Sequence, residues 1–172
     1  MLSDKMLSAL NSQINAEYYS SYLYLSMAAH CRAANLEGFA SWLRIQADEE
    51  MIHAMKIYDF VLERGGRVAL AALDAPPTQW ETPTAIFEAT LAHEQHVTGR
   101  INKLVDLAIA ESDHATNAFL QWFVNEQVEE EASADAVLRK LQLMADAPGG
   151  LFMLDQQLGQ RPAAAAPTDT AA

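Results

Sequence analysis

A carboxylate and an imidazole stand where the sequence predicts the buried face of a helix. Glu50 and His53, in the stretch DEEMIH, follow the three- and four-residue spacing of the apolar residues around them, which is the pattern of a core-facing helix stripe. That stripe comprises Phe39, Leu43, Gln46, Glu50, His53, Ile57 and Phe60. An unpaired buried charge is costly, so Glu50 and His53 need a compensating partner inside the protein.

Three other helical stripes each contain a glutamate as well. They run Leu7, Leu10, Ile14, Glu17, Ser21, Tyr24, Ala28; Phe87, Leu91, Glu94, Thr98, Ile101, Val105, Ala108; and Leu120, Phe123, Gln127, Glu130, Ala134, Val137, Leu141, Met144. Four buried carboxylates repel one another and become protonated unless cations lie between them. Bound metal is the simplest common cause, and a polar network that only fixes helix register is the alternative. Hard oxygen donors with one imidazole suit iron or manganese better than tetrahedral zinc.

Long helices must position these side chains, and the placement of proline allows them. All six prolines fall in three clusters, which leaves residues 1–75 and 84–147 free of the strongest helix breaker. The predicted helices are 4–33, 36–64, 84–111, 113–144 and a short one at 150–160.

The lengths of the connections predict how the helices are arranged. The first and third connections are very short, which makes the joined helices antiparallel neighbours. The link from Gly65 to Pro83 is far longer. A helix of about 28 residues is roughly 42 Å long, and the extended link can span about 60 Å. The second and third helices are therefore predicted to be parallel, in an all-α four-helix bundle with one long crossover and a short fifth C-terminal helix.

This connectivity brings the four carboxylates to similar depths in the bundle. Antiparallel pairing places Glu17 level with Glu50, and Glu94 level with Glu130. The two levels differ by about four residues, roughly 6 Å at the rise of a helix. We expect Glu50 to bridge two metal ions, because it shares a stripe with His53 and lies between Glu17 and Glu94.

Composition narrows the class of protein further. The chain of 172 residues is predicted to form one domain over 1–160, followed by a low-complexity tail at 161–172 (RPAAAAPTDTAA) to which no function is assigned. A net charge of −12 excludes a nucleic-acid binder that works by phosphate neutralisation. A single cysteine, Cys31, and the absence of a signal-like start favour the cytoplasm, and no apolar run is long enough for a membrane span.

The motifs together resemble the ferritin family, and most closely the bacterial non-haem ferritins. The similarity runs through LNSQINAEYYSSYLYLSM, FASWLRIQADEEMIHAMKIYDFV, HEQHVTGRIN, FLQWFVNEQVEEE and GGLFMLDQQL, which together cover almost the whole chain. A lone Glu-x-x-His is a weak signal, but its combination with Glu17, Glu94 and EQVEEE is specific.

The resemblance implies a ligand for each position of a di-iron centre. A first iron would be held by Glu17, Glu50 and His53. A second would be held by Glu50, Glu94 and Glu130, with Gln127 beside it. A third, weaker iron would use Glu49, Glu126, Glu129 and Glu130, for which a solvated charged face is the alternative. Tyr24 and Trp122 match aromatic residues near such centres, where they would donate electrons; otherwise Tyr24 is a hydrogen-bond donor and Trp122 a packing residue.

The resemblance also implies an activity and an assembly. The chain would be an iron store with ferroxidase activity, which oxidises Fe²⁺ with O₂ or H₂O₂ and deposits a ferric mineral inside a shell of 24 chains. The short fifth helix is apolar and is expected to be buried against other copies of the chain.

Three other functions are weighed against this one. A haem-containing bacterioferritin would carry a second Glu-x-x-His where this chain has Gln127-Val128-Glu129-Glu130, so no haem is expected although Met51 follows Glu50. A di-iron oxygenase would need a cavity for an organic substrate. A helical scaffold or metal buffer would bind ions without turnover.

Overall fold

The computed structural model describes residues 1–144 and 147–163, which form five helices. The helices are α1 Asp4–Ala33, α2 Glu37–Glu63, α3 Pro83–Ala110, α4 His114–Leu143 and α5 Gly150–Leu158. The predicted all-α bundle with a short fifth helix is confirmed, and every predicted helix end lies within two residues of the observed one. Most of the predicted tail, residues 164–172, lies outside the described residues, and the predicted domain boundary at residue 160 stays a prediction.

Local cap chemistry explains where three of the long helices begin. Ser3, Thr82 and Asp113 each accept a hydrogen bond in the side chain from the backbone N–H three residues later. Such side chains satisfy N–H groups that have no partner within the helix. Pro83 follows Thr82 at the first helical position, where its fixed φ suits the helix and its missing N–H costs nothing.

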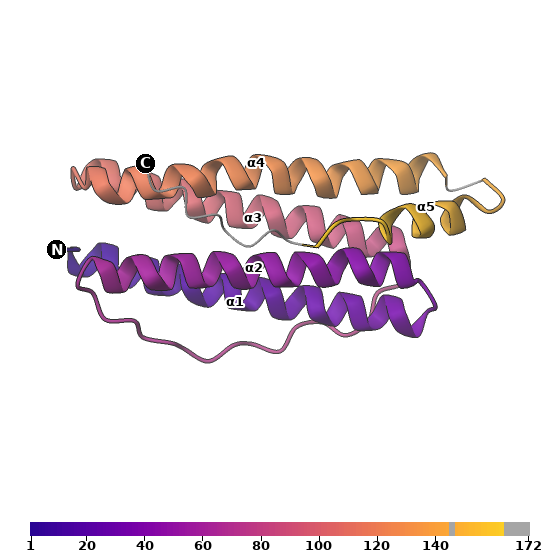
Figure 1. The fold of residues 1–172 in the computed structure, drawn as a ribbon, viewed down its shortest axis with the longest axis horizontal. Helices are drawn as coiled ribbons and strands as arrows, with labels where there is room; N and C mark the ends of the chain where they lie inside the picture. Colours follow the sequence, from indigo (N-terminus) through magenta and orange to yellow (C-terminus); the bar gives the residue numbers. More distant parts are fainter. Residues whose placement is uncertain (145–146, 164–172) are drawn as a thin grey trace.

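The crossover has the predicted course. Residues 64–82 run along the outside of the bundle from one end to the other, so that α2 and α3 point the same way (Figure 1). Asn11 holds this link to α1, since its amide donates to the carbonyl of Arg67 at 3.1 Å and accepts from the N–H of Ala69 at 2.8 Å. Ser26 binds the carbonyl of Pro77 further along. The link is thus fixed along its length by side chains of α1.

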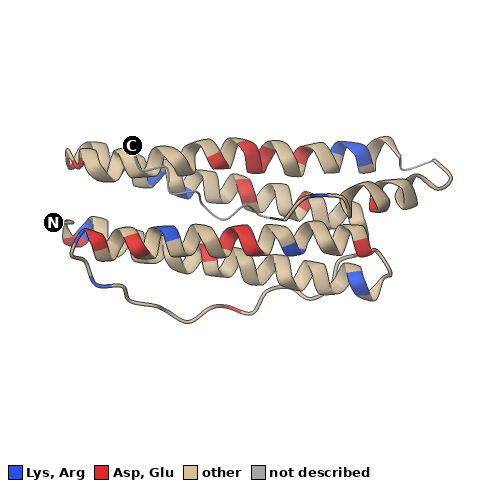
Figure 2. Cartoon of the chain, viewed as in Figure 1, with Lys and Arg blue, Asp and Glu red and all other residues tan. Residues whose placement is uncertain are grey.

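Two apolar clusters fill the bundle on either side of a polar layer. One cluster includes Leu43, Phe87 and Leu154, and the other includes Ile14 and Ile101. Figure 2 shows acidic residues in the middle turns of the long helices. Most of the predicted stripe residues are buried, and those only partly buried are Leu7, Phe60, Leu91, Thr98, Val105 and Met144. Every helix in residues 1–144 and 147–163 is too short or too polar to cross a membrane.

The first turn of α2 has a cap that comes from α5. Leu36 at the N-cap position supplies no side-chain hydrogen bond. Instead the buried carboxylate of Asp155 accepts from the N–H of Gly38 at 2.8 Å and from that of Phe39 at 3.1 Å. A Cβ on Gly38 would overlap the backbone carbonyl of Asp155. The helix that carries Glu50 and His53 therefore begins against α5, and only glycine fits at that contact.

We expect substitutions at this contact to destabilise the protein. Asp155→Ala removes the cap and should lower the free energy of unfolding by about 1–2 kcal/mol. Gly38→Ala should lower it further because the added methyl pushes α5 away. Denaturant unfolding followed by circular dichroism measures both. Gly99→Ala is the matched control, since nothing lies within 4 Å of its Cβ, and it should leave stability unchanged or raise it. Equal effects of the two glycine substitutions would contradict the assigned contact.

Candidate metal centre

Each of the four long helices contributes one buried glutamate to the polar layer. Glu17, Glu50 and Glu94 are each 1% exposed and Glu130 is 6% exposed. His53 is 4% exposed and lies one turn after Glu50 on α2. The helices place these residues on their core faces because the apolar stripes around them must be buried. The structure therefore has one buried carboxylate from each long helix inside the bundle, as predicted.

Three of these side chains form a group with the spacing of metal ligands. Ligand atoms of Glu17, Glu50 and His53 all lie within 4.8 Å of one another. His53 Nδ1 lies 3.5 Å from Glu50 Oε2. Glu17 Oε2 is buried and has no hydrogen-bond partner among the described residues. An unpartnered buried carboxylate oxygen is costly, so this atom fits a site for a cation bound between Glu17, Glu50 and His53.

The remaining two carboxylates are held by donors of the protein itself. The hydroxyl of Tyr24 donates to Glu94 Oε1, and the amide of Gln127 donates to Glu94 Oε2 at 3.2 Å. The amide of Gln46 donates to Glu130 Oε2. Among the described residues, the close groups of three ligands do not include Glu94. The second iron site of Glu50, Glu94 and Glu130 therefore stays a prediction, and hydrogen bonds from the protein occupy oxygens that it would use.

The outer residues predicted for a third site are brought together only in part. Glu126 forms a close group with His53 and Glu130, within 4.8 Å. Glu49 is partly buried, and its Oε2 pairs with Arg161 Nη2 at 2.6 Å. Glu129 is exposed on α4. The role of these residues as iron ligands stays a prediction, and Glu49 already has a cationic partner.

Burial and mutual repulsion make the layer costly to ionise. Desolvation raises the pKa of Glu50 well above its usual value, and the neighbouring Glu94 and Glu17 add to this effect. Desolvation also raises the pKa of Glu94. The pKa of Glu130 rises to about 7, through desolvation and the charge of Glu94. A bound cation would favour the ionised carboxylates, so the electrostatics of the layer fit a metal centre.

Two aromatic side chains flank the centre as predicted. Tyr24 is fully buried, and desolvation followed by the charge of Glu94 raises its pKa well above the usual value, so the phenol stays protonated. Trp122 packs edge-on against His53, with ring centroids 5.4 Å apart, and Lys56 Nζ lies 4.5 Å from its ring. Tyr24 is therefore a hydrogen-bond donor to Glu94, and Trp122 is a packing partner of His53. A role of either in electron transfer stays a prediction.

Several polar residues that contact the centre are not among the site residues predicted from the sequence. Gln13 donates to Glu17 Oε1 at 2.8 Å. Arg100 contacts Gln13, and Arg161 contacts Gln46. The position of Gln13, four residues before Glu17 on the same helix face, is a signal that could have pointed to it. Arg161 lies in the low-complexity tail, where no local pattern marks it.

Comparison with known proteins identifies the family. Residues 7–144 match the family described as Ferritin, the ferritin-like domain. The bacterial non-heme ferritin of Bacteroides fragilis (strain YCH46) is 46% identical over 161 residues, which cover 94% of this chain and 100% of that protein. The bacterial non-heme ferritin of Staphylococcus saprophyticus is 41% identical, with coverage of 94% and 96%. The chain belongs to the ferritin family, and the resemblance of its motifs is confirmed.

A solved structure agrees with this assignment. The open pore ferritin from the hyperthermophilic archaeon Archaeoglobus fulgidus is 52% identical and superposes with a TM-score of 0.93, covering 94% of this chain and 100% of that one. Fold, buried carboxylates and family therefore indicate the same kind of protein, a ferritin with a ferroxidase centre.

We expect metal binding to release protons below neutral pH. Because the pKa of Glu130 is raised to about 7, this carboxyl is largely protonated below that pH, and a cation that binds it must displace the proton. Fe²⁺ affinity should therefore rise with pH through the range below about 7. Anaerobic calorimetry in buffers of different ionisation enthalpy counts the released protons. Glu130→Gln should release fewer protons in the acidic range, and an unchanged count would contradict the assignment.

Proposed function

We propose that the polar layer oxidises Fe²⁺ to Fe³⁺ as the first step of iron storage. Iron is the substrate of this reaction. The observation that carries the proposal is the buried, unpartnered oxygen of Glu17 facing Glu50 and His53 in a member of the ferritin family. The proposed first iron is held by these three residues. The proposed second iron is held by Glu50, Glu94 and Glu130, beside Gln127.

The chain's part in the chemistry is to hold two Fe²⁺ ions close together. Glu50 lies between Glu17 and Glu94 and is the proposed bridge. Two Fe²⁺ ions give up one electron each, and one O₂ takes both electrons with two protons to give H₂O₂. With H₂O₂ as the oxidant, the same two electrons and two protons give two waters. Binding both ions at once lets one oxidant accept a pair of electrons without release of a radical.

The surrounding residues support that chemistry in distinct ways. Tyr24 holds Glu94 through its hydroxyl and is the proposed reserve electron donor, with Trp122 as a second candidate. Glu49, Glu126, Glu129 and Glu130 are the proposed third iron position. The close group of His53, Glu126 and Glu130 supports part of that position. The packed aromatic rings of Phe39, Phe87 and Phe123 beside the layer leave an organic substrate little room, which disfavours a di-iron oxygenase.

Storage requires a container, which we propose is a shell of 24 identical chains. The exposed face of α5 supports assembly, because Leu151 is 40% exposed and Phe152 and Met153 are each 68% exposed. Exposed large apolar side chains that lie together favour burial against another copy. We further propose that the shell works in the cytoplasm and binds no haem. The relatives named non-heme support the absence of haem.

Loss of the bridging carboxylate should abolish the fast oxidation. In Glu50→Ala, the initial rate of Fe³⁺ formation after mixing Fe²⁺ with aerobic protein should fall at least about tenfold, because even groups that only touch a metal ligand cost that much. Stopped-flow ultraviolet absorbance with an oxygen electrode measures the rate. Glu63→Ala, at an exposed position of the same helix, is the control and should keep the fast phase. A fast phase that survives Glu50→Ala would refute the proposed centre.

A charge on the apolar face of α5 should weaken assembly. Phe152→Glu places a carboxylate where we propose an interface between chains, so the particle mass should fall below that of the unsubstituted protein. Size-exclusion chromatography with light scattering gives the mass. Gln156→Glu adds the same charge at an exposed polar position of α5 and should leave the mass unchanged. If Phe152→Glu also leaves it unchanged, α5 is not part of the interface.

A further inference from the structure

We propose that Arg100 and Arg161 are positioning residues for the iron-binding carboxylates, each acting through one buried glutamine. Each guanidinium binds the oxygen of a glutamine amide, and the nitrogen of that amide binds a glutamate. The two chains of contacts are Arg100–Gln13–Glu17 and Arg161–Gln46–Glu130, which we call the two relays. This inference rests on the proposed function, since it concerns how the iron ligands are held.

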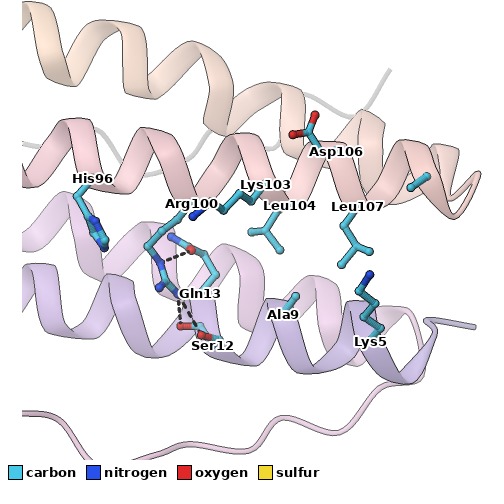
Figure 3. Close-up of a pocket in the computed structure, with 11 residues that line it drawn as sticks. Lys5, Ala9, Ser12, Gln13, His96, Arg100, Lys103, Leu104, Asp106 and Leu107 are labelled. Atoms are coloured by element: carbon cyan, nitrogen blue, oxygen red, sulfur yellow. Dashed lines mark hydrogen bonds between the residues drawn. The ribbon is translucent and has the colours of Figure 1, made fainter.

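The first relay joins α3 to α1. Arg100 Nε donates to Gln13 Oε1 at 2.9 Å, and Gln13 Nε2 donates to Glu17 Oε1 at 2.8 Å. Gln13 is 1% exposed, so water does not compete for its amide. Ser12 fixes the arginine, because Arg100 Nη2 donates to its carbonyl at 2.9 Å and to its hydroxyl at 3.1 Å (Figure 3). These contacts line a surface groove between α1 and α3.

The second relay joins the segment after α5 to α2 and α4. Arg161 Nη1 donates to Gln46 Oε1 at 3.0 Å, and Gln46 Nε2 donates to Glu130 Oε2. Gln46 is fully buried. Two further contacts hold the guanidinium in place, since it lies 4.6 Å from the ring centroid of Trp42 and its Nη2 lies 2.6 Å from Glu49 Oε2.

When the glutamate is ionised, the chemistry of the three groups permits one arrangement only. A guanidinium has donors and no acceptor, an ionised carboxylate has acceptors and no donor, and an amide has one end of each kind. The amide oxygen must therefore face the arginine and the amide nitrogen must face the glutamate. A flipped amide would set donor against donor and acceptor against acceptor, at a cost of about 1–3 kcal/mol for each buried group left unpaired. The arginine thus fixes the direction of the hydrogen bond that the carboxylate receives.

Each relay restrains one carboxylate before iron binds. In Glu17 the relay takes Oε1, and Oε2, in the close group with Glu50 and His53, has no hydrogen-bond partner among the described residues. In Glu130 the relay takes Oε2, which accepts a hydrogen bond from the amide of Gln46. Partners of metal ligands commonly set the orientation of those ligands and so tune affinity. Without the arginine the glutamine oxygen loses its donor, and the amide can turn away from the carboxylate.

Anaerobic calorimetry with Fe²⁺ alone tests the inference on the assembled protein. Arg100→Met and Arg161→Met should each weaken Fe²⁺ binding by about threefold to tenfold, less than the roughly 10–100-fold cost of removing a group that touches a ligand directly. Arg139→Met is the matched control, since among the described residues Arg139 pairs only with Asp135, one turn earlier on its own helix. It should leave the affinity unchanged.

A double-mutant cycle separates the relay from a simple effect of charge. In the Gln13→Leu background the relay is already broken, so adding Arg100→Met should produce no further loss. The same holds at the two-iron centre for Arg161→Met in the Gln46→Leu background, because Glu49, with which Arg161 also pairs, is proposed only for the third iron position. A through-space effect of the lost positive charge would instead change the affinity by the same factor in both backgrounds, and that result would overturn the proposal.

A conservative variant and the parent protein complete the test. Arg100→Lys keeps a group that only donates and should recover part of the affinity lost in Arg100→Met; equal loss in both counts against the relay. Circular dichroism and particle mass confirm that each variant is folded and assembled. If the parent protein binds no pair of Fe²⁺ ions per chain, the proposed function fails. If the parent binds them and every arginine variant matches it, only the relays fail.

Discussion

The repulsion among four glutamates in one dry layer is the constraint around which this bundle is built. Each carboxylate comes from a different long helix, so the layer exists only when all four helices are in register. The crossover of residues 64–82 makes this possible, because it sends α3 back along the bundle parallel to α2. In the protein alone, the repulsion is moderated by donors from Tyr24, Gln127, Gln46 and Gln13. Among the described residues these donors leave Glu17 Oε2 without a hydrogen-bond partner, and we propose that iron is its partner.

The rest of the fold supplies the stability that the polar layer does not. Two apolar clusters enclose the layer on both sides and keep water away from it. Low water content strengthens every electrostatic interaction within the layer, both the repulsion between carboxylates and the attraction of a bound cation. The same burial that makes the ionised carboxylates costly would therefore strengthen their attraction for a bound cation. The polar layer in the middle of the bundle costs folding stability, and the apolar clusters on either side of it supply that stability.

Much of this could be predicted from the sequence because it depends on periodicity and length. The stripes predicted the helices and their buried faces, and the long link predicted the crossover. The connectivity predicted that Glu17 lies level with Glu50, and the family resemblance implied that His53 joins them. Contacts that depend on tertiary structure could not be predicted in this way. Asp155 caps α2 by accepting from the N–H of Gly38, 117 positions earlier in the chain, and no local pattern predicts such a pairing. The hydrogen bonds that direct Glu94 and Glu130 depend on side-chain rotamers, which the stripe pattern does not determine.

The segment around α5 contacts α2 at two points. Asp155 contacts the first turn of α2, and Arg161 contacts α2 near the middle of that helix. These two contacts hold the segment against the helix that carries Glu50 and His53. This matters for anyone who attaches a peptide or an enzyme to the C-terminal end of the chain. A fusion joined before Arg161 would remove the Arg161 contact, whereas a junction placed after Pro162 would keep both contacts with α2.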